Sequence, residues 1–154
     1  NHSAEICLKK TSEVITKCFE ELILNKVDLS GIILKPNMIL AGKDSNHKIS
    51  NQEVSEKTIE CLKNSVPNEV PGIAFLSGGQ SEIEATENLN LINKNNSTNF
   101  IMTYSYGRAL QKSALEMWSK NTNEINSTQN IFNHRAKMCS LAAQGKWSNK
   151  LEYK

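Results

Sequence analysis

One lysine and two glycine-containing segments carry the residue types that could do chemistry in this chain. Lys35 directly follows the apolar run 31–34. Burial disfavours a charged ammonium, and the neutral amine is a nucleophile that can attack a carbonyl and form an imine. The alternative interpretation is a lysine whose aliphatic stem covers a sheet edge while its ammonium reaches water. The position of Lys35 alone leaves both interpretations open.

The glycine-containing segments, Ser77-Gly78-Gly79 and Ser105-Tyr106-Gly107-Arg108, each follow an apolar run and precede a helical pattern. Glycine lets bare backbone amides approach a ligand, and the N-terminus of the following helix favours an anion. Arg108 adds a guanidinium that can bind two phosphate oxygens. Either segment alone could be a tight connection, but two such loops after neighbouring strands indicate a phosphate site. Together with Lys35 they predict the binding of a phosphorylated carbonyl compound.

Apolar spacing predicts the elements that must position these segments. Runs rich in β-branched and apolar residues indicate strands at 31–34, 72–76 and 100–105. Apolar residues three and four apart indicate helices over 3–25, from residue 50, from residue 81, around 110–118 and over about 124–144. Capping boxes at Ser50 to Glu53 and Ser81 to Glu84 mark two of the helix starts.

Strands that alternate with helices predict an α/β fold with a parallel sheet covered by helices. Two architectures fit this order: a doubly wound open sheet, or part of an eight-stranded βα barrel. In both, ligands bind at the carboxyl ends of the strands. We therefore expect Lys35 and both glycine-containing segments to lie at the same end of the sheet.

Composition excludes several other classes. A length of 154 residues fits one domain or a piece of a larger one. The net charge of +2 is too small to indicate a nucleic-acid or acidic-membrane partner, and the longest apolar run is too short to span a bilayer. The four cysteines form no C-x-x-C pair and have no histidine at ligand spacing, so we expect reduced thiols and no metal.

The remaining conspicuous residues are expected to be structural or solvated. Trp118 and Trp147 are predicted to be packing residues, and Arg135 with Lys137 an ordinary solvated face. The histidines lie at the start of the chain, in a polar loop and among polar helical neighbours, so a solvated surface is expected for each of them.

The same residues resemble the class I, Schiff-base-forming fructose-bisphosphate aldolases. The matching stretches are Leu34-Lys35-Pro36-Asn37-Met38, residues 70–82, Asn88-Leu89-Asn90, residues 104–111 and residues 140–146. They span nearly the whole chain in order. A βα barrel takes about 250 residues and eight strands, whereas this chain has three expected strands. The resemblance therefore implies the C-terminal part of a (β/α)8 TIM barrel, with residues 1–154 as a single segment and the N-terminal part of the barrel outside it.

The resemblance also implies roles for individual residues. Lys35 would form the imine, and a second group would hold the phosphate on carbon 1 of the ketose: Ser77, Gly78, Gly107 and Arg108, with Ser105 nearby. The implied reaction is the reversible cleavage of fructose 1,6-bisphosphate into dihydroxyacetone phosphate and glyceraldehyde 3-phosphate, a step of glycolysis. The implied lyase uses no cofactor and no metal. Its acid and base carboxylates would come from earlier strands.

The implied protein is cytoplasmic, forms a homo-oligomer, commonly a tetramer, and has no nucleic-acid or membrane partner. Two alternatives to this lyase stay open at the level of sequence. One is a truncated, non-catalytic relative that binds phosphorylated sugars or acts as a scaffold. The other is a Schiff-base lyase for a different phosphorylated ketose. The family's tail ends in a tyrosine well beyond the site matched by Gly145-Lys146-Trp147, whereas Tyr153 follows that site closely, so a tail role for Tyr153 is not expected.

Overall fold

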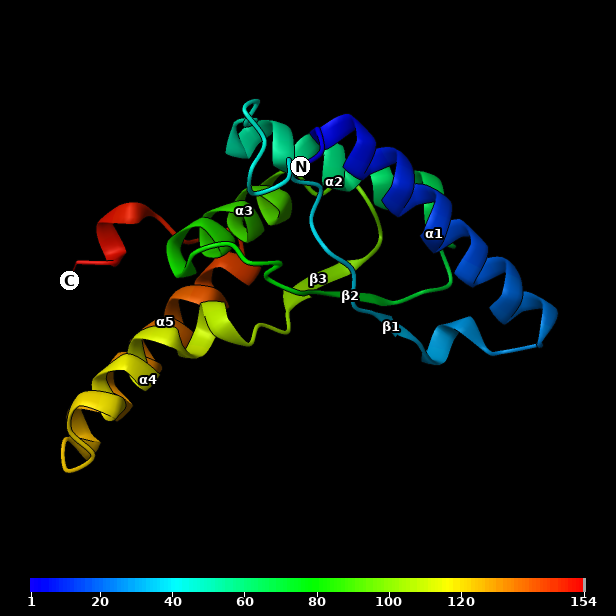
Figure 1. The fold of residues 1–154 in the computed structure, drawn as a ribbon. Helices are drawn as coiled ribbons and strands as arrows, with labels where there is room; N and C mark the ends of the chain where they lie inside the picture. The colour runs from blue at the N-terminus through cyan, green and yellow to red at the C-terminus, as the bar shows by residue number, and fades with distance from the viewer. Residues whose placement is uncertain (154) are drawn as a thin grey trace.

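The structure is a computed structural model, and it describes residues 1–153 (Figure 1). Helices and strands alternate as expected from the apolar spacing. In chain order the elements are α1 (Ala4–Leu24), the 3-10 turn η1 (Leu29–Gly31), β1 (Ile33–Leu34), α2 (Asn51–Ser65), β2 (Gly72–Phe75), α3 (Glu82–Asn95), β3 (Ile101–Tyr104), α4 (Arg108–Lys120), α5 (Ile125–Ala143) and the 3-10 turn η2 (Asn149–Leu151).

Both predicted capping boxes are present. The hydroxyl of Ser50 accepts from the amide of Glu53 at 3.2 Å, and Ser81 accepts from the amide of Glu84 at 3.1 Å. In each pair the carboxylate of the glutamate accepts a hydrogen bond from the backbone amide of the serine. Because these bonds satisfy amides that have no acceptor within the helix, they fix where α2 and α3 begin.

The strands of the described chain form one parallel sheet in the order β1-β2-β3. Gly72 pairs with Ile33 on one side and with Ile101 on the other. β1 is shorter than the sequence predicted, because η1 occupies residues 29–31 and Pro36 has no amide hydrogen to donate. The parallel pairing confirms the α/β class.

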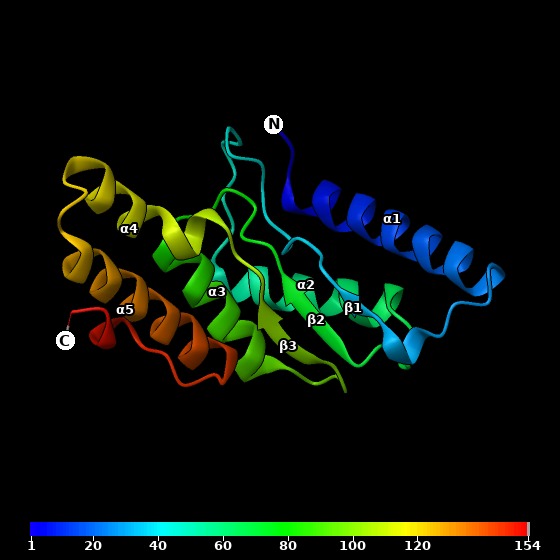
Figure 2. The same cartoon turned by 90° about the horizontal axis from the view of Figure 1, so that it is seen from below.

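One face of this sheet is covered by helices and the other is bare (Figures 1 and 2). Ile73 and Phe75 point into the helical layer and have no exposed surface. On the other face Ile33 is 68% exposed and Ile101 is 75% exposed. The prediction of a buried first strand is therefore wrong for the side chain of Ile33. Parallel sheets are normally buried on both faces, and here a second covering layer is missing from one of them.

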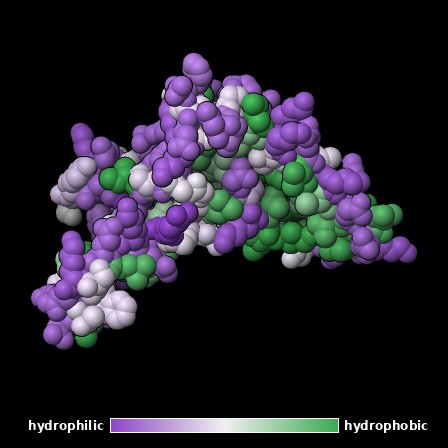
Figure 3. Space-filling model, in the orientation of Figure 1, coloured by the Kyte–Doolittle hydropathy of each residue, from purple (hydrophilic) through white to green (hydrophobic). Residues whose placement is uncertain are grey.

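Apolar surface gathers beside the bare face. The exposed large side chains there are at the end of α1 and in and just before β1: Ile23, Leu24, Val27 and Ile33. Figure 3 shows hydrophobic atoms concentrated at the lower right, where Figure 1 places β1 and the end of α1. A contiguous apolar surface of this kind is typical of a surface that contacts other protein.

The core lies between the sheet and the helices α1, α2, α3 and α5. Trp147 is buried beside this core, as predicted, and its amide donates to the side chain of Asn90 at 3.0 Å. Trp118 is half exposed near the end of α4, so the prediction of a packing role is wrong for this residue. Arg135 was predicted to lie on a solvated face, and this prediction is wrong because the residue is buried on α5. Among the described helices, none has the length and apolarity needed to cross a membrane.

Candidate active site

The register of the sheet brings the three chemistry-bearing segments to one end. Beyond the strands, the amide of Leu76 donates to the carbonyl of Pro36 at 3.0 Å, and the amide of Ser105 donates to Phe75 at 2.8 Å. The pairing therefore continues one or two residues past each strand. Lys35, the turn at 77–79 and the loop at 105–108 all follow the carboxyl ends of adjacent parallel strands.

Lys35 lies on the bare face of the sheet. The register that pairs Leu34 with Ile73 continues with Lys35 level with Ala74 and Thr103, whose side chains alternate away from the helical layer. The lysine is exposed and lines a cavity of about 400 Å³ between α1 and β1. Ser105 lies two residues and Ser77 three residues further along the strands, roughly 7 to 10 Å by the rise of a strand. This offset suits a ligand with a carbonyl at the lysine and a phosphate at the loops.

The chain just after Lys35 is held against α1. The side-chain amide of Asn37 donates to the hydroxyl of Thr11 at 3.2 Å and to the carbonyl of Met38 at 3.0 Å. The side chain of Met38 is buried in the core. These contacts fix the backbone that carries the lysine, while its own side chain stays free to reach a ligand.

The turn that follows β2 needs its glycines. Gly78 and Gly79 have φ values of 57° and 84°, a left-handed backbone that other residues rarely adopt. The turn closes with a bond from the amide of Gln80 to the carbonyl of Ser77 at 3.1 Å. Within residues 1–153, the amides of Ser77, Gly78 and Gly79 have no acceptor. The turn therefore presents free amide donors at the end of the sheet, and an anion can accept hydrogen bonds from them.

The loop that follows β3 offers a second set of donors. Gly107 precedes α4 without a side-chain cap, and the amides of Arg108 and Ala109 have no acceptor within residues 1–153. Arg108 is the first residue of α4, and its side chain is exposed. Ser105 is exposed at the same end. Free amides together with a guanidinium form an anion-binding arrangement.

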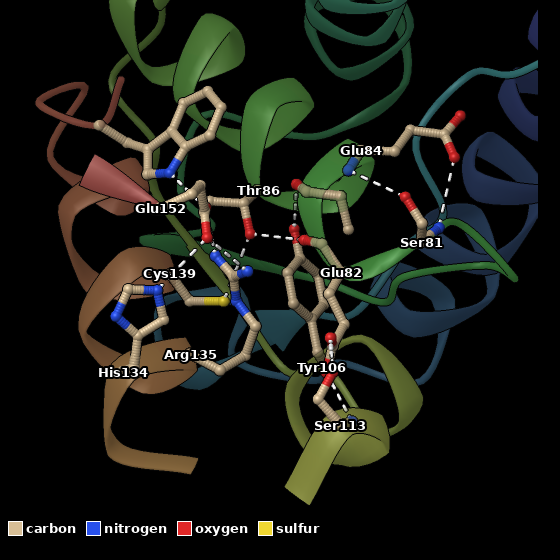
Figure 4. A network of polar contacts seen from close by, with 12 residues as sticks. Ser81, Glu82, Glu84, Thr86, Tyr106, Ser113, His134, Arg135, Cys139 and Glu152 are labelled. Carbon is tan, nitrogen blue, oxygen red and sulfur yellow. Dashed lines mark hydrogen bonds and ion pairs between the residues drawn. The ribbon is translucent and has the colours of Figure 1, made fainter. Parts of the chain in front are cut away.

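This second loop is anchored on α3 (Figure 4). The buried hydroxyl of Tyr106 donates to the carbonyl of Ala85 at 2.9 Å. Burial raises the pKa of the Tyr106 phenol far above its usual value, so the hydroxyl remains a donor. The carboxylate of Glu82 accepts from both the amide and the hydroxyl of Ser113 on α4. α3 thereby holds the loop and the helix that begins with Arg108.

Sequence reasoning did not single out Gln80 and Tyr106 as residues that support the site. Both lie inside stretches that resemble the aldolase family. The partners of Gln80 and Tyr106 include Asn88 and Ala85, which are 8 and 21 residues away. No short-range pattern indicates such contacts.

Neither the histidines nor a cluster of metal ligands adds a second candidate site within residues 1–153. His2 and His47 are exposed, as predicted. His134 is partly buried, and its Nε2 lies 3.5 Å from the carboxylate of Glu152. Within the part of the chain that the structure describes, no three His, Cys, Asp or Glu side chains gather in a way that could hold a metal ion.

A parallel sheet with helices on one face, a bare opposite face and glycine-containing loops at its carboxyl end is the arrangement of part of a βα barrel. The family model "Glycolytic: Fructose-bisphosphate aldolase class-I" matches residues 1–154. The chain belongs to this family of aldolases.

Individual relatives agree with the family match. The chain is 45% identical over 148 residues to fructose-bisphosphate aldolase C of Carassius auratus, covering 96% of this chain and 41% of that protein. It is 42% identical to the Plasmodium falciparum aldolase, covering 95% of this chain and 40% of the relative. A solved structure of the Plasmodium falciparum enzyme with TRAP and a small-molecule inhibitor superposes with a TM-score of 0.92 at 41% identity, over 96% of this chain and 43% of that one. The chain thus spans less than half the length of these relatives.

Proposed function

We propose that this chain is the closing segment of a lyase that cleaves fructose 1,6-bisphosphate reversibly into dihydroxyacetone phosphate and glyceraldehyde 3-phosphate. The observation that carries the proposal is the placement of Lys35 beside two amide-bearing loops at one end of a parallel sheet. The family to which the chain belongs supports the same substrate.

In the proposed reaction the amine of Lys35 attacks carbon 2 of the ketose and expels water to form an imine. The protonated imine accepts the electron pair released when the bond between carbons 3 and 4 breaks. The hydroxyl on carbon 4 loses its proton and becomes the aldehyde of the departing product. The group that takes this proton is expected from the strands that complete the barrel.

The phosphate on carbon 1 is proposed to bind at the two loops. The glycine turn, residues 77–79, follows β2 and directs its free amides to the ligand. The amide of Gly78 is the main donor, with Ser77 beside it. Gly107 and Arg108 supply amides and a guanidinium from β3, with Ser105 next to them. A dianionic phosphate would be neutralised in part by Arg108 and by the two helix N-termini.

The bare face of the sheet supports the proposal that the chain works as one segment of a barrel. β1 and β3 both have an unpaired edge within the described chain. Ile33 of β1 and Ile101 of β3 are exposed on the bare face of the sheet. Closing a barrel would pair both edges and bury both isoleucines. Residues 1–154 would then act as a single segment rather than as a separate domain.

A cytoplasmic location and a tetrameric homo-oligomer also stay proposals. Fructose-bisphosphate aldolase 4 of Arabidopsis thaliana, 41% identical to this chain, is named cytosolic. Light scattering coupled to size-exclusion chromatography would measure the number of subunits.

The test needs a closed barrel. This chain matches the C-terminal portion of its relatives, so the N-terminal part of the Plasmodium falciparum relative can be fused ahead of Asn1. We call this fusion the completed enzyme. Dihydroxyacetone phosphate is added, the imine is reduced with borohydride, and the labelled peptide is mapped by mass spectrometry.

We expect the adduct on Lys35, and its loss together with cleavage activity in Lys35→Met. Lys43→Met is the matched control, because Lys43 lines a cavity beside the glycine turn but lies outside the proposed imine site. An adduct on another lysine would contradict the assignment. Binding of the phosphorylated ligand without imine or turnover would instead support the non-catalytic alternative.

A further inference from the structure

The side chain of Gln80 joins the glycine turn to helix α3. Its Nε2 donates to the carbonyl of Ser77 at 2.8 Å, and its Oε1 accepts from Nδ2 of Asn88 at 2.7 Å. Gln80 is 9% exposed and Asn88 is completely buried. The bridge is therefore shielded from water, and its two ends lie on the turn and on the second helical turn of α3.

This bridge determines which way one peptide group of the turn points. The carbonyl of Ser77 accepts from both the amide and the side chain of Gln80. In a trans peptide the carbonyl and the amide of the next residue point in opposite directions. Holding the Ser77 carbonyl toward Gln80 therefore turns the amide of Gly78 away from it, where it stays free to bind an anion.

The bridge also touches the segment that carries the lysine. Nε2 of Gln80 lies 3.6 Å from the sulfur of Met38, which is 1% exposed and three residues after Lys35. The backbone of this segment is bonded to β2 through Leu76 and Pro36. Gln80 thus contacts both segments expected to hold the two ends of the substrate.

Asn88 gives an independent sign that the bridge matters. Its Oδ1 is buried and has no hydrogen-bond partner among residues 1–153. A buried polar atom without a partner lowers stability. A leucine would avoid this cost and fit an apolar helix face, but it could not donate to Gln80.

We propose that Gln80 is a positioning residue, oriented by Asn88, which aims the Gly78 amide at the carbon 1 phosphate. The inference rests on the proposed function, because it takes the glycine turn as the phosphate site. It goes beyond that function by assigning the orientation of the turn to two side chains that do not touch the substrate.

Gln80→Met in the completed enzyme tests the inference, because methionine has a similar length but no amide to donate. We expect dihydroxyacetone phosphate and inorganic phosphate to bind about tenfold more weakly. Imine trapping with unphosphorylated dihydroxyacetone should change by less than about twofold. If Gln80 had only a structural role, the substitution would weaken the phosphorylated and unphosphorylated ligands equally.

Thr86→Val is the matched control. Thr86 is also fully buried on α3, and its hydroxyl donates to the carbonyl of Glu82 at 2.7 Å. This variant loses a buried hydrogen bond without touching the glycine turn. Its melting temperature should fall, while the ratio of affinities for phosphorylated and unphosphorylated ligands stays unchanged.

A double mutant tests whether Asn88 acts through Gln80. Asn88→Leu alone should weaken phosphate binding several-fold in the same selective way, by about threefold to tenfold. In a Gln80→Met background the same change should have no further effect on phosphate binding. Additive losses would contradict action through Gln80.

Equal losses for all three ligands, or unchanged phosphate affinity in Gln80→Met, would overturn the positioning role. Failure of the proposed function would look different. In that case the unsubstituted completed enzyme would form no imine on Lys35, while inorganic phosphate binding would still report whether Gln80 orients the turn.

Discussion

Arg135 and Glu152 form a bidentate ion pair that is almost completely buried. The two guanidinium nitrogens donate to the two carboxylate oxygens at 2.9 and 2.7 Å, and the side chains are 6% and 4% exposed. The indole of Trp147 donates to the same carboxylate at 2.6 Å. This cluster fastens the segment after α5 to the helix (Figure 4).

The ion pair predicts a loss of stability in acid. Burial by itself would raise the pKa of the Glu152 carboxyl, but hydrogen bonds from Arg135 and Trp147 outweigh burial and hold the pKa below its usual range. A carboxyl whose pKa is lowered on folding stabilises the protein above its unfolded pKa of about 4.3. This contribution is lost as the pH falls through the lowered pKa.

The measurement is the melting temperature of the completed enzyme between pH 3 and pH 7. Glu152→Gln should show a shallower decline in acid than the unsubstituted protein. Glu152→Ala at neutral pH should cost about 3 kcal/mol, because it leaves the Arg135 charge buried and unpaired. Parallel acid transitions in the unsubstituted protein and Glu152→Gln would show that another group dominates.

Arg108→Ala is expected to weaken phosphorylated ligands selectively. A hydrogen bond to a charged group contributes roughly 1.5–3 kcal/mol, so dihydroxyacetone phosphate should bind about ten- to a hundredfold more weakly. Imine trapping with dihydroxyacetone should hardly change. Lys112→Ala, which removes an exposed cation four residues along α4, is the matched control.

Arg108→Lys should recover only part of the affinity, because an ammonium cannot bind two phosphate oxygens in the fork geometry of a guanidinium. Equal weakening of phosphorylated and unphosphorylated ligands by Arg108→Ala would instead assign the residue a structural role. A fall in melting temperature would accompany that result.

Tyr106→Phe should destabilise the loop that follows β3. The substitution removes the hydrogen bond from the buried hydroxyl to Ala85, at a cost of about 1 kcal/mol. The ring still fills its place, so the core should remain packed. Thermal unfolding of the completed enzyme measures the loss, and Tyr104→Phe serves as control because its hydroxyl makes only a long, 3.5 Å contact.

The 154-residue chain without the rest of the barrel should self-associate and show no measurable cleavage of fructose 1,6-bisphosphate. Its exposed sheet face and unpaired edges favour association, and the proton-transfer groups are expected elsewhere. Ile33→Thr with Ile101→Thr should reduce light scattering, since both side chains are on the bare face. Ile6→Thr, which changes an exposed side chain on α1, should have a smaller effect. Robust turnover by this chain alone would contradict the proposal that the proton-transfer groups come from the rest of the barrel.

The sequence already specified most of the elements, because their signals are local. Helix starts at Ser50 and Ser81 depend on bonds across three residues, and the strands follow from short apolar runs. Lys35 and the glycine turn were located for the same reason, since a residue type directly after a strand is visible in the chain itself. Their roles in binding and catalysis remain predictions.

Burial and long-range partners were decided by tertiary structure. Arg135 looked solvated on its helix, yet it is buried because Glu152, 17 residues away, neutralises it. Ile33 looked buried, yet it is exposed because its strand has helices on only one face. Periodicity shows that a side chain is apolar or lies on a given face. Whether that face is covered depends on segments that come close only after folding, and no local pattern contains that information.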